Sequence, residues 1–326
     1  MIAPTREKTT ARTLGVLAGC LADAVLGDPR RGHPVAGFGT LAAQLERVTY
    51  RDSRTAGAVH TATLLGGLAA AAWSVQRMAA GSRFWSATTV AAATWVALGG
   101  TSLARTGLEM ADLLDAADTA GARKLLPSLC GRDPDLLDID GMTRAALESI
   151  AENTSDAQVA PVLWAAVGGV PGVLLYRAIN TLDAMVGHRS PRYARFGWAA
   201  ARTDDIANYL GARVAGALVV VCAPLVGGSA SGALRAWWLD AGKHPSPNAG
   251  VVEAAFAGAL GVALGGPTQY RHELQIRPTL GNGTAPRVAD LRRAVALSQV
   301  VQAAAAVLAV GISACGRSGR RAFARR

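Results

Sequence analysis

Residues 147–213 read LESIAENTSDAQVAPVLWAAVGGVPGVLLYRAINTLDAMVGHRSPRYARFGWAAARTDDIANYLGAR, and this stretch decides the fold. Two clusters of polar residues bracket a run of 20 uncharged residues, 157–176. At the centre of the run, 168–172 reads GGVPG, which predicts a break into two half-helices or a re-entrant turn. If the chain re-enters, both polar clusters emerge on the same side of the membrane.

The cluster before the run is rich in acids. In a helix, Glu148, Glu152 and Asp156 lie at i, i+4 and i+8 along one drifting face, with Asn153 and Thr154 beside them. Like charges at this spacing destabilise a helix. A bound cation or a cationic substrate would explain why they gather here.

The cluster after the run mixes acids, amides and arginines. Oxygen ligands of this kind suit Mg²⁺, which takes one or two carboxylates plus substrate phosphates. Interleaved arginines suit phosphate or carboxylate oxygens. A solvated, salt-bridged face is the alternative interpretation. The members are Arg177, Asn180, Asp183, His188, Arg189, Arg192, Arg195, Arg202, Asp204, Asp205, Asn208 and Arg213.

The composition predicts a membrane protein. Of the 326 residues, 51% are hydrophobic and only 17% are charged, whereas soluble domains carry about 25% charged residues. We therefore predict an all-α, polytopic helical bundle with broken or re-entrant segments, in which abundant Ala and Gly allow close helix contacts. The candidate spans, each near the ~20 residues that a crossing needs, are 55–76, 84–104, 157–176, 214–234 and 294–316.

The net charge of +10 has two possible causes, nucleic-acid binding or basic loops at the cytoplasmic face. The arginines lie in loops between apolar windows and few aromatics accompany them, so we favour the second cause and expect no nucleic-acid partner. The expected location is the cell membrane, with the motif loops cytoplasmic. Four widely spaced cysteines, without a CxxC motif, are expected to be inert packing residues: Cys20, Cys130, Cys222 and Cys315.

We predict a single membrane-embedded domain, 1–326, with basic tails at 1–12 and 317–326 and a soluble helical linker at 105–147. Near the N-terminus, Asp23 and Asp28 flank the end of an apolar helix. The prolines of GDPRRGHP (27–34) then predict a shaped loop.

A third polar patch follows the 214–234 window. Ser246 or Asn248 is expected to cap a helix that begins near 250, with Glu253 supporting its first turn. A capped helix terminus is also an anion site, and Lys243 and His244 lie just upstream. An ordinary cap is the alternative interpretation.

Taken together, these patches resemble the cobalamin-biosynthesis membrane proteins of the CobD/CbiB family, the adenosylcobinamide-phosphate synthases. The resemblance covers most of the chain, in the order of the family's motifs. The tails lie outside it, and YLG at 209–211 stands where a stretch containing more proline is common. The matching motifs are LADAVLGDPRRGHPVAGFG (21–39), ESIAENTSD (148–156), YRAINTLDAMVGH (176–188), YARFGWAAARTDDIANYLGAR (193–213) and SPNAGVVEAAFAGALGVALGGP (246–267).

The resemblance implies amide-bond formation between adenosylcobyric acid and (R)-1-amino-2-propanol or its O-phosphate, driven by ATP with Mg²⁺. No G-x-x-x-x-G-K-[ST] motif occurs, so a nucleotide site here is not a P-loop. The lipid bilayer and other cobalamin-biosynthesis enzymes are the other expected partners. Cations near the patches favour the phosphorylated amine over the free alcohol: Arg30, Arg31, Arg177, Arg189, Arg202, Arg213 and Lys243.

We assign roles to these residues as follows. The expected catalytic residues are Glu152, Asp183, Asp204 and Asp205, and the expected metal ligands are Asp156, Asp183 and Asp204. The expected substrate- or phosphate-binding residues are Asp28, His33, Asn153, Arg177, Asn180, Arg202, Asn208, Arg213, Lys243, Ser246 and Asn248.

Two other classes of function compete with the ligase interpretation. A secondary transporter would also have broken helices and acids near the bilayer midplane, but most acids here lie beside the apolar windows. A membrane phosphotransferase acting on CDP-alcohols would carry a D-G-x-x-A-R motif, and no Asp-Gly precedes Ala212-Arg213. The ligase is therefore preferred.

Overall fold

The computed structural model of the protein describes residues 6–28, 32–188, 190–269 and 274–315. Most of these residues are helical, and the chain divides into two compact units, which we describe separately. Unit 1 comprises Met1–Gly99, Ala160–Asn208 and Ala305–Arg326, and unit 2 comprises Gly100–Val159 and Tyr209–Ala304. The prediction of an all-α, polytopic membrane protein is confirmed.

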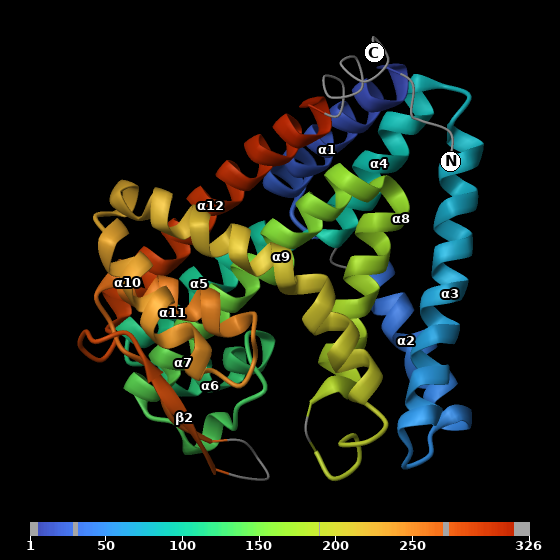
Figure 1. Ribbon diagram of the computed structural model, residues 1–326. Helices are drawn as coiled ribbons and strands as arrows, with labels where there is room; N and C mark the ends of the chain where they lie inside the picture. The colour runs from blue at the N-terminus through green and yellow to red at the C-terminus, as the bar shows by residue number, and fades with distance from the viewer. Residues whose placement is uncertain (1–5, 29–31, 189, 270–273, 316–326) are drawn as a thin grey trace. The chain divides into compact units, whose positions relative to one another are not determined.

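Unit 1 consists of helices (Figure 1). In its core, α1 packs closely on α4 because α1 has glycines one turn apart: a Cβ placed on Gly15 would lie 2.6 Å from the Cβ of Val90, and one on Gly19 would lie 2.6 Å from the Cβ of Thr94. The elements are α1 (Arg6–Leu26), α2 (Pro34–Thr49), α3 (Arg54–Ala79), α4 (Arg83–Ala97), α8 (Ala160–Leu182), the π-helical turn η4 (Asp183–Gly187), the first part of α9 (Trp198–Cys222) and the end of α12 (Val288–Cys315).

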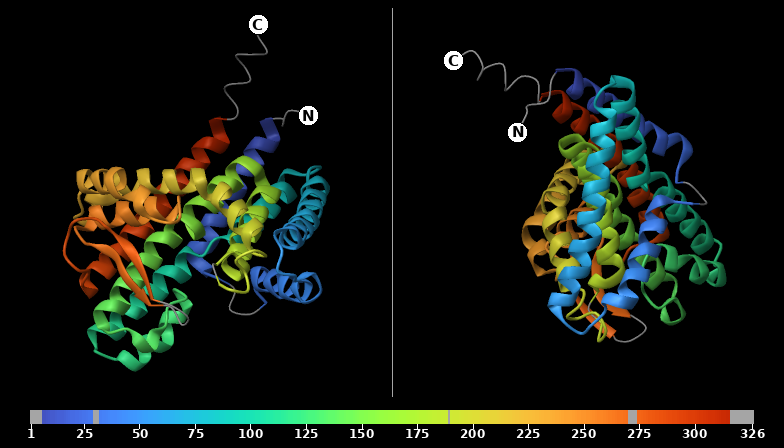
Figure 2. Two further views of the ribbon diagram at one scale, coloured as in Figure 1. Left: turned by 60° about the horizontal axis from the view of Figure 1, so that its bottom comes forward. Right: turned by 90° about the vertical axis from the view of Figure 1, so that its right-hand side faces the viewer.

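Helix α8 is a helical hairpin and not one straight rod, with α3 beside it (Figure 2). The backbone of Gly169 is non-helical, with φ 62° and ψ −145°. A Cβ placed on Gly172 would lie 2.6 Å from the carbonyl oxygen of Trp164, whereas residues eight apart in a continuous helix are separated by about 12 Å along the axis. The chain therefore reverses at Gly169, as the GGVPG sequence predicted.

Polar side chains of neighbouring helices satisfy the backbone groups that this reversal exposes. Arg12 on α1 donates from Nη1 to the carbonyl oxygen of Val167 at 2.8 Å. The Oε1 atom of Gln76 on α3 accepts from the N–H of Val170 at 3.2 Å. These contacts cap the end of the first arm and the start of the second, so the break is part of the packed unit.

Replacing Gly169 with alanine should lower the free energy of unfolding by about 1–3 kcal/mol, because only glycine adopts this backbone conformation without strain. The added Cβ would also lie 2.5 Å from Oε1 of Gln76. Gly168→Ala is the matched control, since a Cβ there meets nothing within 4 Å. Thermal unfolding of both variants in detergent micelles checks the prediction, and equal stability of the two would contradict it.

Unit 2 packs around α7 and α11, whose side chains are buried on nearly every face, Leu147, Ile150 and Phe256 among them. The helices of unit 2 are α5 (Gly100–Asp115), α6 (Thr119–Leu125), α7 (Ile139–Thr154), α10 (Ala230–Asp240), α11 (Ala249–Leu260), the second part of α9 and the first part of α12. The short turns are η1 (Leu126–Ser128), η2 (Pro134–Leu136), the π-helical η3 (Ser155–Val159), η5 (Ala223–Val226) and η6 (Ala241–Lys243). Residues 105–147, predicted as a linker, contribute α5, α6 and the first half of α7 to this unit.

Strands β1 (Leu264–Gln269) and β2 (Leu274–Leu280) form an antiparallel hairpin in unit 2. Leu264 pairs with Leu280 and Gly266 with Arg277, and the register shifts between 264 and 266. The predicted all-α fold contained no strands here. Two consecutive glycines hide the strand signal, because they remove the alternating side chains that mark a strand.

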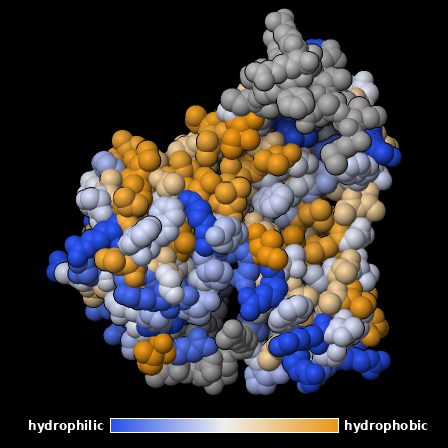
Figure 3. Space-filling model, viewed as in Figure 1, coloured by the Kyte–Doolittle hydropathy of each residue, from blue (hydrophilic) through white to orange (hydrophobic). Residues whose placement is uncertain are grey.

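Within the described residues, four helices are long and apolar enough to cross a membrane: Arg54–Ala79, Ile139–Gly187, Trp198–Val226 and Val288–Ala314. The predicted window 84–104 is wrong as a single span, because the chain leaves the helix at Leu98 (ψ 160°) and α4 has only 15 residues. The window 214–234 is misplaced, since its helix begins at Trp198 and the chain turns at Gly227 in the left-handed conformation. Apolar side chains gather on the surface over α12 (Figure 3), as expected for a helix in lipid.

Candidate active site

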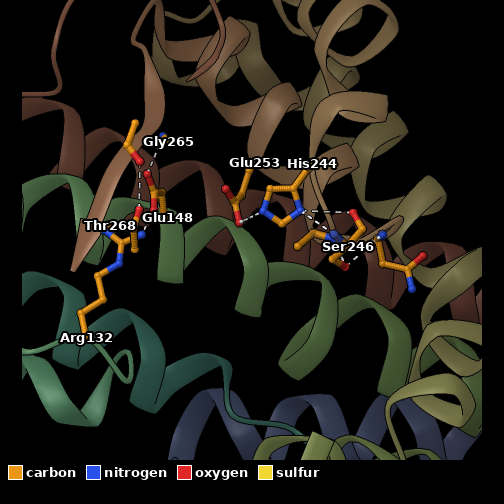
Figure 4. Close-up of polar contacts among 10 residues, drawn as sticks. Arg132, Glu148, His244, Ser246, Glu253, Gly265 and Thr268 are labelled. Carbon is orange, nitrogen blue, oxygen red and sulfur yellow. Dashed lines mark hydrogen bonds and ion pairs between the residues drawn. The ribbon is translucent and has the colours of Figure 1, made fainter. Parts of the chain in front are cut away.

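Acidic and basic side chains of unit 2 meet between α7, α11 and the β-hairpin, and we call this group the carboxylate cluster (Figure 4). Three of its members are acids that act electrostatically on one another, and two are arginines that offset them. The cluster consists of Glu148, Glu152, Glu253, Arg132, Arg277 and His244.

Glu148 is the anchor of the cluster. Its Oε2 atom forms an ion pair with Arg132, and both side chains are buried, 4% and 5% exposed. Its Oε1 atom accepts a hydrogen bond of 2.7 Å from the N–H of Gly265. An ionised carboxylate is tolerated at such depth only when a charge partner and hydrogen bonds replace its water, and Glu148 has both.

The irregular step in β1 provides that hydrogen bond. Gly265 has φ 86°, a left-handed conformation that favours glycine, and it lies at the register shift of the hairpin. A Cβ at this position would lie 2.1 Å from the carbonyl oxygen of Pro278. Only glycine therefore lets the bulge turn its N–H toward Glu148.

Glu253 and His244 form a second buried pair. Nε2 of His244 lies 3.8 Å from Oε1 of Glu253, and the side chains are 5% and 2% exposed. Nδ1 of the same ring accepts from the N–H of Ser246 at 3.0 Å. Burial raises the pKa of Glu253 well above its usual range, and the charges of Glu148 and Glu152 raise it further. Burial also lowers the pKa of His244, so the surroundings favour the uncharged form of both groups.

Glu152 is the accessible acid of the cluster. It follows Glu148 by one turn of α7, and its side chain is exposed, unlike those of Glu148 and Glu253. Arg277 of β2 lies near enough for its charge to act on Glu253. The arrangement places one exposed carboxyl group, Glu152, beside a buried carboxyl group paired with Arg132 and a buried acid whose pKa is raised. Such a division of environments is typical of catalytic acid–base groups.

The third polar patch surrounds the start of α11. The predicted cap is confirmed for Ser246, whose Oγ accepts from the N–H groups of Asn248 and Ala249 at 3.3 and 3.2 Å. Asn248 is at the N-cap position without a side-chain cap bond, and its Oδ1 instead accepts from Arg213 at 2.6 Å. Lys243 binds Oδ1 of Asp240 at 2.6 Å. The patch thus contains both an ordinary cap and an oriented arginine.

The described members of the second cluster belong to unit 1, except Arg213, which belongs to unit 2. Tyr176 and Asn208 are both buried, and the Tyr176 hydroxyl donates to Oδ1 of Asn208 at 2.7 Å. The amide nitrogen of Asn208 donates to Oδ2 of Asp204 at 2.9 Å. This chain fixes Asp204 against the second arm of the α8 hairpin. Two further pairs are local: Arg202 with Asp205 at 3.1 Å, and Arg177 with Asn180 at 3.3 Å.

Two acids lie in π-helical turns: Asp156, directly before the uncharged run, in η3, and Asp183, beyond the end of the run, in η4. Single π-turns inside helices are often found at functional sites. Asn153 is turned back on its own helix, where Nδ2 donates to the carbonyl oxygen of Ser149 at 2.9 Å. The two acids therefore keep their place as candidates, while Asn153 has a local structural role.

The loop after α1 contributes less to a site than the sequence suggested. His33 caps α2, because its Nδ1 accepts from the N–H of Val35 at 3.2 Å. Asp28 is half-buried at the edge of the described part. Three of the predicted phosphate-binding cations, Arg30, Arg31 and Arg189, lie outside the described residues.

Arg192, a member of the second sequence cluster, serves the structure of unit 1. Its Nη2 donates to Oε1 of the buried Glu46 at 2.8 Å, and its guanidinium lies 4.0 Å from the ring centroid of Tyr50. The hydrogen bond to Glu46 and the contact with Tyr193 raise the pKa of Arg192. These contacts of Arg192 with Glu46 of α2 and with Tyr50 hold the loop before α9 in place.

Within the described ranges, no three His, Cys, Asp or Glu side chains are placed to hold a metal ion by themselves. Mg²⁺ commonly takes only one or two protein carboxylates and completes its shell with water and phosphate oxygens. The assignment of Asp156, Asp183 and Asp204 as ligands therefore stays a prediction.

The sequence analysis did not place four members of the carboxylate cluster in a site. Glu148 was predicted only as part of an acidic helix face suited to a cation, without a role of its own, and Glu253 only as support for a helix cap. Arg132 and Arg277 belong to motif-free segments, and no local pattern marks them. Two signals in the sequence were available: the single acid, Glu253, in the otherwise apolar α11, and the two acids, Glu148 and Glu152, one turn apart in α7.

Comparisons with known proteins cover nearly the whole chain. A family model described as "CobD/Cbib protein" matches residues 16–298. Proteins called "Cobalamin biosynthesis protein CobD" from Mycobacterium tuberculosis (strain ATCC 25618 / H37Rv) and Mycobacterium bovis are each 68% identical over 299 residues, covering 92% of this chain and 95% of theirs. The protein of that name from Stutzerimonas stutzeri is 43% identical over 288 residues, covering 87% and 92%. No solved structure matches the chain.

Proposed function

Because this chain belongs to the CobD/CbiB protein family, we propose that it acts in cobalamin biosynthesis as an amide-forming enzyme. The reaction joins the free carboxylate of adenosylcobyric acid to (R)-1-amino-2-propanol or its O-phosphate, the activity of an adenosylcobinamide-phosphate synthase. The observation that carries the proposal beyond family membership is the carboxylate cluster, which divides three acids into different environments.

Amide formation makes two demands on a protein site. A C–N bond forms and a C–O bond to the leaving group breaks, while the attacking nitrogen must lose a proton. An accessible carboxylate can accept that proton, and Glu152 has this position. Arg277, which is only half-buried, would offset the negative charge that develops on the substrate oxygens.

A free carboxylate is a poor acyl donor, so Mg-ATP, when bound, would supply the phosphate leaving group. The oxygen-rich side chains Asp156, Asp183 and Asp204 match the ligand chemistry of Mg²⁺ and are the proposed ligands. The arginines of both polar clusters suit the phosphate oxygens. Both cofactors belong to the proposal and rest on the family and on this donor chemistry.

The proposed setting is the cell membrane, with the motif loops on the cytoplasmic side. Four candidate spans support a multi-pass protein. A corrinoid is large and polar, and its substrate carboxylate would reach the site from water. Other enzymes of cobalamin biosynthesis are proposed as further partners.

We expect purified protein in detergent to form an amide from adenosylcobyric acid and the amine only when Mg-ATP is present. Chromatography with mass detection would follow the product, and the nucleotide product would be measured in the same sample. Omitting ATP, omitting Mg²⁺ and omitting the amine are the three controls. Amide formed at the same rate without nucleotide would overturn the ATP-driven mechanism, and no amide under any condition would overturn the enzyme assignment.

A further inference from the structure

A pocket of about 340 Å³ lies in unit 2 beside the start of α11. Among the described residues that line it, Arg213 is the one with a permanent charge, and none is a carboxylate. Trp237 and two prolines, Pro245 and Pro247, supply apolar surface, and His244 supplies a ring that is uncharged in these surroundings. The pocket is therefore positively charged and partly apolar.

Arg213 is held in a fixed orientation without an acidic partner. Its Nη1 atom donates to Oδ1 of Asn248 at 2.6 Å and to the carbonyl oxygen of Tyr209 at 3.0 Å. The guanidinium also lies 3.7 Å from the ring centroid of Tyr209. Among the described residues no carboxylate pairs with Arg213, and its hydrogen bonds all come from Nη1. The protein thus holds the guanidinium through Nη1, while the N–H groups of Nε and Nη2 can donate to a ligand.

A guanidinium fixed in this way is suited to an anion with two oxygens in one plane, such as a phosphate group. Most of its rotational freedom is already lost before a ligand arrives, which lowers the entropic cost of binding. The neighbouring Lys243 does not supply the charge, because it is bound to Asp240 at 2.6 Å. Recognition of the anion therefore depends on Arg213.

We propose that this pocket binds the phosphate group of a small molecule, with Arg213 as its ligand and Asn248 as a positioning residue. The inference rests on the amide-forming function proposed above and deepens it. The phosphate belongs either to the amine donor or to the nucleotide, and these share the same chemistry. The carboxylate cluster lies directly behind the pocket, since His244 lines the pocket and contacts Glu253.

Isothermal titration calorimetry on the full chain in detergent tests the pocket directly, with inorganic phosphate, the amino-alcohol phosphate, the free amino alcohol and ADP as separate probes. Arg213→Gln should weaken binding of inorganic phosphate, and of at least one of the two phosphorylated probes, at least tenfold. Its affinity for the free amino alcohol should not change. Arg235→Gln removes the same charge from an exposed position in unit 2 that does not line the pocket, and should bind every probe as the parent does.

Arg213→Lys keeps the charge but loses the fork, and should bind phosphate more weakly than the parent and more tightly than Arg213→Gln. Thermal unfolding shows whether each variant is folded. A folded Arg213→Gln protein that binds all phosphates like the parent overturns the proposal. Weaker binding of the amino-alcohol phosphate alone assigns the pocket to the amine donor, and weaker binding of ADP assigns it to the nucleotide.

The amide assay separates the failure of this inference from failure of the proposed function. If phosphate binding depends on Arg213 but the protein forms no amide, the phosphate pocket is supported and the proposed reaction is rejected. If Arg213→Gln forms the amide with unchanged KM for the phosphorylated amine and for ATP, the proposed reaction is supported and the phosphate pocket is rejected.

Discussion

Replacing Arg132 with methionine should lower the free energy of unfolding by about 3–5 kcal/mol, the usual cost of leaving one half of a buried ion pair without its partner. Glu148 would keep only its hydrogen bond from the N–H of Gly265, at a depth where its side chain is 4% exposed. Thermal or denaturant unfolding of the purified protein in detergent measures the loss.

The double variant Arg132→Met with Glu148→Gln is the informative control. Glutamine removes the buried charge but keeps an oxygen that accepts from Gly265, so the double variant should recover much of the lost stability. Arg235→Met at an exposed position should change stability by no more than about 0.5 kcal/mol. A double variant as unstable as the single one would show that the ion pair does not determine stability here.

The second large effect concerns the division of roles among the acids. Glu152→Gln should reduce kcat/KM for amide formation by about 10²–10⁴-fold, because the accessible proton acceptor is lost. Glu253→Gln should keep most of the activity, since glutamine resembles the uncharged acid that the surroundings favour. The amide assay with both variants at neutral pH measures the contrast.

A stability–pH profile tests the same assignment independently. Glu253 faces Glu148 and Glu152 on α7, Arg277 on β2, Arg132 before α7 and His244 before α11. Because the pKa of Glu253 is raised in the folded state, the unfolded chain releases this proton first, near pH 4.3. The folded protein should therefore lose stability as the pH rises from that value toward the raised pKa.

Glu253→Gln cannot lose this proton, so its stability relative to the parent should improve across the same pH window. The parent and Glu152→Gln should both keep the decline that Glu253 causes. An unchanged pH profile in Glu253→Gln, together with a loss of activity as large as that of Glu152→Gln, would show that Glu253 works as a carboxylate.

Local sequence rules predicted what depends on neighbouring residues. The break at Gly169 follows from three glycines and a proline within five positions, and the cap at Ser246 follows from the residue type before an apolar helix. The acid spacing of α7 was also visible, because one turn of a helix fixes it. Each of these features needs no knowledge of distant segments.

Features that join distant segments could not be predicted. Gly265 donates to Glu148 across 117 positions of the chain, and no pattern in either segment points to the other. The window 84–104 failed for a related reason: averaged hydropathy is insensitive to a helix end, and the chain turns at Leu98 without becoming more polar. The roles of Asp183 and Asp204 stay predictions.

The reversal at Gly169 also limits how often this part of the chain can cross a membrane. A hairpin whose arms lie side by side contributes an even number of crossings, or none, so it cannot change which side the chain is on. The tip of the hairpin is Gly168-Gly169, so its insertion into the bilayer requires no charged loop to cross. If this hairpin enters the bilayer, we therefore expect the segments that precede and follow it to lie on the same side of the membrane.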